Sequence, residues 1–264
     1  MRACGLRLWE FDHLLASQRG WFGTRAHRLV EETSPAIDLV DGWPAYEQSR
    51  RATSNSVMQS TARKRRKLER EHGPIRLTFD EPDHASLDLI LGWKSEQYRR
   101  TGRRDRFADR ATRTLVHELL DVRDPRFGAP LTVLRAGDQI VAAHFGLRSP
   151  SVLAWWFPVY DPRFGAYSPG RILCLEIARA MTAERIQVLD LGKGDEEYKR
   201  RLANAEIGLL RGAVARSPRT ARIDIIRHWP QERAMSLVLG SPRLRGWARD
   251  GLAQIGAARQ AIRR

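Results

Sequence analysis

The alternation of apolar and polar residues is most informative in the middle of the chain. Residues 151–160, SVLAWWFPVY, are apolar almost throughout, which is typical of a strand covered on both faces. Pro158 has no backbone N–H to give to a neighbouring strand, so we expect the hydrogen-bond ladder to be interrupted there. The pattern therefore predicts a strand in which some backbone groups are left available.

A loop, a helix, a short strand and a second helix follow this strand. Ser168 is a suitable N-cap, and Pro169 fits the first helical position, where its missing N–H costs nothing. Apolar residues at four-residue spacing carry the helix to about residue 184. The strand QVLDLG comes next, and Gly192-Lys193-Gly194 opens the second helix. A helix N-terminus reached through a glycine-containing loop offers N–H groups and a positive dipole end to a phosphate.

The flanking segments are predicted from the same kinds of pattern. We expect a helix from Ser54 to His72, followed by a strand in GPIRLTF. A second helix is capped by Asp83 and stops at Thr101-Gly102, and a third covers residues 103–120 with Leu115 and Leu119 facing inward. Residues 131–148 are expected to form a hairpin that turns at Ala136-Gly137-Asp138. Residues 1–55 hold only short apolar pieces. Residues 219–264 are predicted to be helical, with a break at Gly240-Ser241-Pro242.

The positive charge of the chain is concentrated outside its central region. The formal net charge is +15. Residues 61–76 hold seven basic and two acidic residues, and residues 211–264 hold twelve and three, so the remainder has 27 basic and 26 acidic residues. The central strand–loop–helix unit therefore lies in a nearly neutral part of the sequence.

Several functional classes are disfavoured by what the sequence lacks. No apolar run approaches the roughly 20 residues needed to cross a bilayer, and the N-terminus lacks the features of a signal peptide. Two cysteines, Cys4 and Cys174, and scattered histidines show no zinc-ligand spacing. Neither a G-x-x-x-x-G-K-[ST] loop nor a G-x-S-x-G elbow is present. We expect two reduced thiols in a cytoplasmic protein without a metal.

Five collinear segments carry a family resemblance. They are KRRKLEREHGPIRL, LGWKSEQYRRTGRRDRF, LTVLRAGDQIVAAHFGLR, WWFPVYDPRFGAYSPGRILCLEIA and LDLGKGDEEYKRRL, within residues 60–215. Together they resemble the acyl-CoA site of the GNAT acyltransferase superfamily, and most closely its CelD/BcsL-type branch, whose acetyltransferase-like members are linked to cellulose and other polysaccharide synthesis.

The resemblance implies a fold and a division of the chain. The fold is α/β (α+β), with a GNAT-like, mostly antiparallel mixed sheet flanked by helices. Residues 1–80 correspond to the remnant of a first GNAT-like half and a basic helix, residues 81–216 to the acyltransferase domain, and residues 217–264 to a basic helical tail. Most of the first half would lie upstream of Met1, so the protein is either a shortened member or begins late in its gene.

The resemblance also implies where acetyl-CoA or another acyl-CoA binds as co-substrate. Backbone groups beside Pro158 would pair with pantetheine and meet the oxyanion, and the basic glycine-bearing loop would hold the pyrophosphate. The loop departs from the superfamily's R-x-x-G-x-G/A spacing. The residues predicted at the cofactor are Trp156, Phe157, Val159, Arg163, Gly165, Tyr167, Ser168, Gly170 and Arg171.

Catalytic and acceptor residues are predicted in the same way. Tyr198 corresponds to the tyrosine that serves the leaving thiolate, and Lys199 beside it would lower the cost of negative charge. Asp190 is the first choice of base, His144 the second and Asp161 the third; a water relay without a dedicated base is the alternative. The residues expected to line the acceptor pocket are Lys94, Tyr98, Arg103, Arg104 and Phe107.

The predicted function is acyl transfer to an amine or hydroxyl of a sugar or cell-envelope polysaccharide precursor. Two alternatives remain open: a Fem-type transferase that uses aminoacyl-tRNA, and a non-catalytic GNAT-shaped subunit of a polysaccharide synthesis machine. The basic helix at residues 54–72 is a solvated face, a site for CoA phosphates, a charged glycan or an anionic membrane surface, or a nucleic-acid contact. The last helix either packs on the main domain or lies in a membrane interface, which would make the protein peripheral to the inner membrane face.

Overall fold

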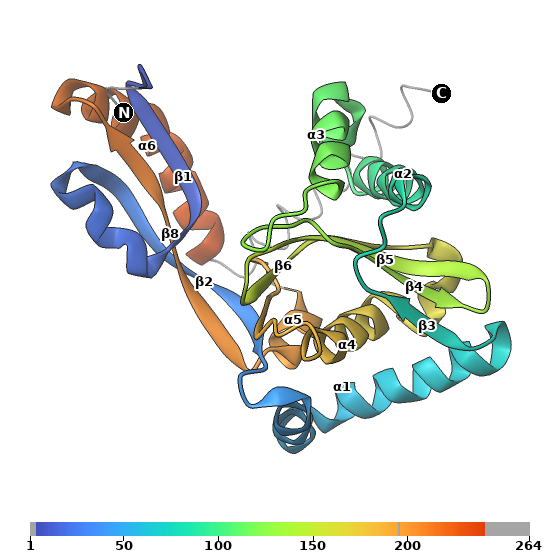
Figure 1. Cartoon of the computed structure of the whole chain (residues 1–264). Coiled ribbons are helices and arrows are strands. Elements are labelled where there is room, and N and C mark those ends of the chain that lie inside the picture. Colours follow the sequence, from blue (N-terminus) through green and yellow to red (C-terminus); the bar gives the residue numbers. More distant parts are fainter. Residues whose placement is uncertain (1–3, 195, 241–264) are drawn as a thin grey trace. The chain divides into compact units, whose positions relative to one another are not determined.

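The computed structural model describes residues 4–194 and 196–240. Packing of the backbone divides the chain into two compact units (Figure 1). Unit 1 comprises the described parts of residues 1–33, 100–102 and 207–264, and unit 2 comprises residues 34–99 and 103–206. The units divide near residues 33 and 206, whereas the predicted boundaries fall at residues 80 and 216, because two long strands run from one unit into the other.

Eight strands and six α-helices are described within these ranges. The strands are β1 (Leu8–Leu15), β2 (Ala26–Asp38), β3 (Ile75–Thr78), β4 (Leu131–Ala136), β5 (Gln139–Arg148), β6 (Val152–Tyr160), β7 (Val188–Asp190) and β8 (Ala205–Ala215). The helices are α1 (Gly42–His72), α2 (His84–Arg100), α3 (Arg110–Leu120), α4 (Pro169–Met181), α5 (Glu197–Leu202) and α6 (Pro218–Gly240). A 3₁₀ helix at Pro162–Tyr167 joins β6 to α4.

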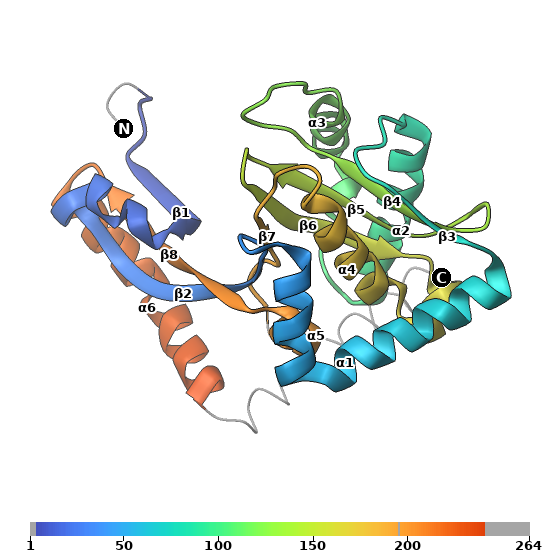
Figure 2. The ribbon, with the colours of Figure 1, turned by 60° about the horizontal axis from the view of Figure 1, so that its bottom comes forward.

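Unit 2 is a sheet with helices on both faces. Its strand order is β2-β7-β6-β5-β4-β3, and neighbouring strands are antiparallel except β6 with β7. Figures 1 and 2 show α1, α4 and α5 on one face of the sheet and α2 and α3 on the other. Each face has its own buried apolar cluster. The expected GNAT-like, mostly antiparallel sheet flanked by helices is confirmed.

An irregularity in β6 explains how this one strand contributes to both cores. Leu153 and Trp155 of β6 belong to the cluster under α1 and α4, and Phe157 and Val159 belong to the cluster under α2 and α3. Successive side chains of a regular β-strand point to opposite faces, so these four residues, each two positions apart, would all share one face. The register shift between Ala154 and Phe157 moves Phe157 and Val159 to the other core.

Unit 1 contains strands in the order β1-β8-β2, together with the helix α6. Phe11, Leu210 and Val214 form its small buried cluster. The predicted helix after residue 218 is confirmed as far as Gly240, and the predicted break at Gly240-Ser241-Pro242 and the last helix lie outside the described residues. No helix among the described residues is both long and apolar enough to cross a membrane.

Three predicted helices have different bounds. The helix expected from Ser54 begins at Gly42, and Ser54 itself is a non-helical break with φ −139° and ψ 37°. The helix expected over residues 103–120 is a 3₁₀ turn at Arg106–Ala108 followed by α3, because the Asp109 side chain caps α3 by accepting from two backbone N–H groups. The helix expected to end near residue 184 ends at Met181.

One predicted helix face is wrong in phase. Leu115 is exposed and Leu119 is partly buried, whereas Val116 and Leu120 are the fully buried residues of α3. The pair that packs inward is therefore shifted by one residue. Other expectations are confirmed: Asp83 caps α2, the hairpin β4–β5 turns at Gly137-Asp138, and both cysteines are free thiols.

Candidate active site

The centre of the site is a bulge in β6. The pairing of β5 with β6 shifts between Phe157 and Ala154, so that Trp155 and Trp156 both lie opposite Gly146. The ladder continues past Pro158, which pairs in register with His144. The predicted interruption exists, but it lies two residues before Pro158 and not at the proline.

His144 fills this bulge. Its ring is fully buried and stacks on Trp155 with ring centroids 4.5 Å apart. Nε2 accepts the Trp156 N–H at 3.2 Å and lies 3.1 Å from the Ala154 carbonyl oxygen. A Cβ on Gly146 would come within 2.5 Å of the ring, so only glycine leaves room for it. Burial lowers the pKa of His144 to about 3.

These contacts correct two predictions. His144 was the second choice of base, but its Nε2 already holds the bulge and none of the ring is exposed. Trp156 was expected to offer an unpaired N–H, but that N–H donates to His144. The His144 imidazole thus supplies the hydrogen-bond acceptor that a neighbouring strand supplies elsewhere in the sheet.

Beyond the bulge, one edge of β6 faces no strand. β7 pairs with β6 only over Val152–Ala154 and ends at Asp190, so within the described residues the second half of β6 has no partner on that side. A proline is tolerated on such an edge because no neighbour needs its N–H. The Pro158 carbonyl accepts instead from Lys94 Nζ of α2 at 3.0 Å.

The Asp161 N–H donates to the Val141 carbonyl across this register, and hydrogen-bonded pairs alternate along an antiparallel ladder, so the backbone of Phe157 and Val159 is turned toward β5. The open edge presents the Pro158 carbonyl and the backbone of Tyr160 as candidate partners for amides of a ligand, which corrects the predicted role of Phe157 and Val159.

Lys94 is a partly buried cation at this edge. Its ammonium also lies 5.5 Å from the centre of the Tyr98 ring. Burial, and after it the positive charge of Arg103, lowers the pKa of Lys94 to about 8. Of the residues predicted to line the acceptor pocket, Lys94 is the one that reaches the open edge of β6.

The other predicted acceptor residues have different surroundings. Phe107 is fully buried in the core under α2 and α3, which corrects its placement in a pocket. Tyr98 stacks on Phe107, with centroids 6.0 Å apart. Arg103 and Arg104 are exposed in the loop after α2.

The end of β7 and the start of α5 bring Tyr198 to the bulge. The Tyr198 hydroxyl accepts from Trp155 Nε1 at 3.3 Å. Burial raises its pKa, so the phenol keeps its proton at neutral pH. Lys199 is buried and donates to the Gly192 and Lys193 carbonyls at 3.3 Å, besides its ion pair with Glu196 at 3.2 Å. Lys199 therefore stabilises the turn after β7. The prediction had placed it beside the Tyr198 phenol instead.

Two carboxylates proposed as bases already have close partners. The Asp190 carboxylate accepts from the Ser34 hydroxyl and, at 2.9 Å, from the Gly192 N–H. The Asp161 carboxylate accepts from Arg163 Nε at 2.8 Å and from its terminal nitrogen at 2.6 Å. These Arg163 contacts hold the pKa of Asp161 below its usual range. The structure thus ties Asp190 to a turn and Asp161 to an ion pair.

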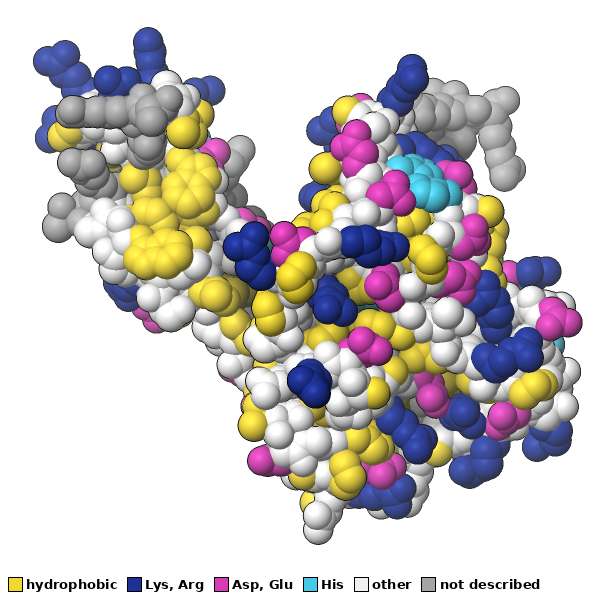
Figure 3. Space-filling model, in the orientation of Figure 1, with side chains coloured by type: hydrophobic (Ala, Val, Ile, Leu, Met, Phe, Trp, Pro, Cys, Tyr) yellow, Lys and Arg dark blue, Asp and Glu magenta, His cyan; other side chains and the backbone are white. Residues whose placement is uncertain are grey.

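A compact basic cluster lies at the N-terminus of α4. Lys64 Nζ of α1 donates to the Ser168 hydroxyl at 2.7 Å, and Arg171 donates to the same oxygen at 3.2 Å. Partial burial, with Arg171 and Arg63 nearby, lowers the pKa of Lys64. Figure 3 shows dark-blue basic side chains gathered over the region of α1. Lys64, Ser168 and Arg171 are called the cationic cluster below.

The role predicted for Ser168 at this helix end is wrong. Its backbone is left-handed (φ 54°, ψ 53°), and its side chain makes no capping hydrogen bond. Pro169 has no N–H, and the Arg171 and Ile172 N–H groups both donate to the Ser168 carbonyl, so α4 presents the Gly170 N–H and its positive dipole end next to the cationic cluster. Lys64 is not among the residues predicted at the cofactor; the signal for it was the run of basic residues in α1, for which CoA phosphates were one predicted ligand.

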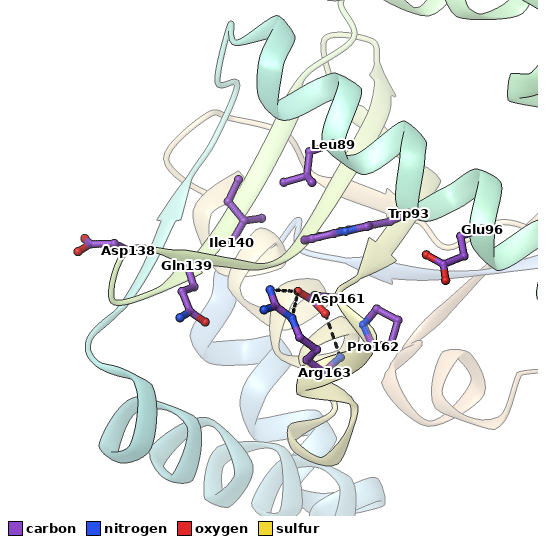
Figure 4. Close-up of a pocket in the computed structure, with 9 residues that line it drawn as sticks. All are labelled: Leu89, Trp93, Glu96, Asp138, Gln139, Ile140, Asp161, Pro162 and Arg163. Atoms are coloured by element: carbon purple, nitrogen blue, oxygen red, sulfur yellow. Dashed lines mark hydrogen bonds and ion pairs between the residues drawn. The ribbon is translucent and has the colours of Figure 1, made fainter.

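The remaining loop residues have other surroundings. The Tyr167 hydroxyl donates to Glu71 at 2.7 Å and lies 3.1 Å from His72 Nε2, which ties the loop to α1. Gly165 and Gly170 both lie against the Tyr160 ring. Arg163 lies beside Asp161 in a recess of about 610 Å³ on the α2 side of the sheet (Figure 4).

The comparisons identify the family. A model described as "Acetyltransferase (GNAT) domain" matches residues 55–200, which is more than half of the chain. The protein therefore belongs to the GNAT acetyltransferase domain family. A search of the curated proteins finds no matching sequence.

Solved structures agree on the fold. The C-terminal domain of a putative lysylphosphatidylglycerol synthetase from Agrobacterium fabrum is similar with a TM-score of 0.54 at 15% identity, over 85% of this chain and 72% of that one. A conserved protein of unknown function from Bacteroides thetaiotaomicron gives 0.52 at 15% identity, over 76% and 68%. At such identities the likeness concerns the fold alone.

Proposed function

We propose that the protein is an acyl-CoA-dependent acyltransferase, with acetyl-CoA as the donor. The observation that carries this proposal is the cationic cluster at the N-terminus of α4, which is joined to the splayed strand β6 by the 3₁₀ helix Pro162–Tyr167. Helix N-termini with adjacent basic side chains are suited to phosphate. An open strand edge leading to them is suited to the amides of a pantetheine arm.

Each group of residues has a separate role in the proposed reaction. The cationic cluster holds the phosphates, and the backbone of Pro158–Tyr160 on the open edge of β6 pairs with the pantetheine amides. The acceptor nitrogen or oxygen attacks the thioester carbonyl, the C–S bond breaks, and the acceptor proton passes to water. Tyr198, kept protonated by burial, gives its proton to the leaving thiolate and regains one from solvent. Lys94 lies at the same edge of β6, near the developing oxyanion.

The acceptor we propose is a sugar or a cell-envelope polysaccharide precursor. Support comes from the five collinear segments that resemble the CelD/BcsL-type branch. The family match supports acyl transfer in general and leaves the acceptor to experiment.

A second candidate is a transferase that takes its acyl group from aminoacyl-tRNA. The observation that favours it is the fold likeness to a domain whose name, lysylphosphatidylglycerol synthetase, indicates transfer of an amino acid. The net charge of +15 would suit a nucleic-acid donor. A non-catalytic subunit that retains only the fold is the third possibility.

Calorimetry with acetyl-CoA tests the proposal. We expect micromolar binding to the wild type and a large loss in Arg171→Glu. Absence of CoA binding by the wild type would rule out the first candidate. Binding of aminoacyl-tRNA in preference to uncharged tRNA would support the second, whereas equal and steeply salt-dependent binding of both would indicate only a basic surface.

A further inference from the structure

The outward face of α6 has an unusual composition. The one acidic residue between Arg219 and Trp229 is Asp224, and it is buried. None of the exposed side chains in this stretch is acidic or neutral polar, so the face combines positive charge with apolar surface. Its exposed residues are Arg219, Arg222, Ile223, Ile225, Ile226, Arg227 and Trp229.

The side of α6 that meets the sheet of unit 1 is polar (Figure 1). The Asp224 carboxylate accepts from Arg28 Nε of β2 at 2.7 Å and lies 2.9 Å from His27 Nε2. His228, one turn further along the helix, lies 3.5 Å from the Glu10 carboxylate of β1. The buried apolar cluster of unit 1 includes no described side chain of α6. Hydrogen bonds and ion pairs therefore hold this helix to the sheet.

This orientation of α6 is the reverse of the usual one. A surface helix of a globular protein turns its apolar side chains toward the core and its charged side chains toward solvent. In α6, Ile226 is 71% exposed and Ile223 is 59% exposed, whereas Asp224 between them is buried. Apolar side chains gathered on one exposed face mark a surface that a membrane or another molecule covers.

The charge of the face selects among the surfaces that could cover it. Arginine beside isoleucine and tryptophan is the composition of helices that lie in the interface of an anionic bilayer. There the arginines meet lipid phosphates, a tryptophan ring lies at the level of the headgroups, and isoleucine reaches the acyl chains.

Other parts of this protein complement the face less well. Because the face exposes no acid between Arg219 and Trp229, a second copy of it would bring arginine against arginine. Residues 241–264 hold six arginines and one aspartate, so they too would oppose its charge.

We propose that α6 docks the protein on an anionic lipid bilayer, with Ile223, Ile226 and Trp229 entering the interface and the arginines contacting lipid phosphates. The sequence patterns left a membrane contact open for two other segments, residues 54–72 and the last helix. The exposed face of α6 is a separate place. The contact concerns where the protein works, and it does not depend on the reaction proposed for unit 2.

Flotation with unilamellar vesicles tests the proposal. The full chain is mixed with vesicles of phosphatidylcholine containing one third phosphatidylglycerol, or with vesicles of phosphatidylcholine alone. We expect binding to the anionic vesicles to be at least about ten-fold tighter and to weaken as salt is added. Equal binding to both kinds of vesicle, or no binding to the anionic ones, overturns the proposal.

Ile226→Asn separates insertion from attraction by charge, because it leaves the net charge unchanged. It should weaken binding to the anionic vesicles by about ten-fold, since the side chain no longer transfers apolar surface out of water. Leu115→Asn removes an apolar side chain of α3 that is 51% exposed, and this matched control should bind normally. Unchanged binding in Ile226→Asn would mean that charge alone attracts the protein to lipid, which contradicts the proposal.

Arg222→Gln measures the contribution of charge on the same face. It should weaken binding to the anionic vesicles by about five-fold, which is the usual contribution of one basic residue near such a surface. Arg110→Gln, an exposed arginine at the start of α3, is the matched control. An equal loss in both variants would assign the attraction to the whole protein and not to α6.

Two further measurements separate the other outcomes. If the wild type ignores vesicles but forms dimers that Ile226→Asn dissociates, light scattering assigns the face to a second copy and overturns the bilayer. Unchanged thermal unfolding and acetyl-CoA binding show that Ile226→Asn is folded. Absence of acetyl-CoA binding by a wild type that binds the anionic vesicles would remove the proposed donor and leave the membrane contact standing.

Discussion

The cationic cluster at the start of α4 and the recess of about 610 Å³ beside Asp161 differ in the charge of the side chains that form them. The cluster joins Lys64 and Arg171 through a single hydroxyl oxygen. The recess sets three carboxylates around one guanidinium. The net charge of +15 for the whole chain does not indicate the local charge at either place. Local pairing decides which ligand each place attracts, since a buried or paired charge contributes little to the field outside it.

Lys94 offers the largest expected effect, because it is a cation partly buried at the edge of β6. Its pKa is about 8 in the folded protein and 10.5 in the unfolded chain, so the folded state loses its proton first. The folded protein is therefore penalised below pH 8, and the penalty disappears as the pH rises from 8 to 10.5. That window corresponds to about 3 kcal/mol.

Chemical denaturation of the wild type and of Lys94→Met at pH 7 and pH 10 checks this expectation. The wild type should gain stability relative to the variant across this range. Lys67→Met, on the exposed side of α1, is the control and should show no such difference. Parallel pH profiles for wild type and Lys94→Met would mean that Lys94 is well solvated and does not lie in the edge of β6.

Charge reversal in the cationic cluster comes next. Arg171→Glu should weaken acetyl-CoA binding by about 100-fold, because it removes one cation and repels the phosphates. Arg179→Glu, at the opposite end of the same helix, is the matched control. Equal losses in both variants would indicate a general effect of charge.

Removal of Lys64 should have a smaller effect. Lys64→Gln should weaken acetyl-CoA binding by about ten-fold, which is the usual contribution of one charged hydrogen bond. Lys67→Gln, one turn further along α1, contacts the Tyr167 ring and should bind acetyl-CoA normally. Calorimetry of the two variants shows whether α1 takes part in donor binding through this one residue or through its whole basic face.

The smallest effect is expected at Ser168. Because its side chain does not cap α4, Ser168→Ala should cost well under the roughly 1 kcal/mol that loss of a real N-cap costs. Acetyl-CoA affinity should fall no more than a few-fold. Thermal unfolding and calorimetry on the same sample check both points, and a loss of 1 kcal/mol or more would restore Ser168 as a cap.

The elements around the site were predictable because their signals are local. The apolar run of β6, the proline at the start of α4 and the Asp83 cap of α2 each act through neighbours within a few residues. Errors arose where two local signals competed. Ser168 has a residue type that caps helices, but the left-handed turn takes its hydroxyl away from the helix. In α3, the predicted inward face was displaced by one residue, so that Val116 is buried and Leu115 is exposed.

The candidate site was predictable only in part. The segment and the family were visible in the sequence, whereas most partners of the key side chains lie far away in it. Lys64 meets Ser168 across 104 residues, and Lys94 meets Pro158 across 64. Such pairings depend on how helices cross the sheet, which no local pattern encodes.

By itself the sequence determined the family, the order of strands and helices in the central region, and the uneven distribution of charge. The tertiary structure decided where the ladder of β6 breaks, that His144 is a buried support of that break, and that Arg163 lies in an acid-lined recess. The physical reason is that secondary structure follows from short-range periodicity and capping, whereas burial, ion pairing and pKa shifts depend on neighbours that only folding brings together.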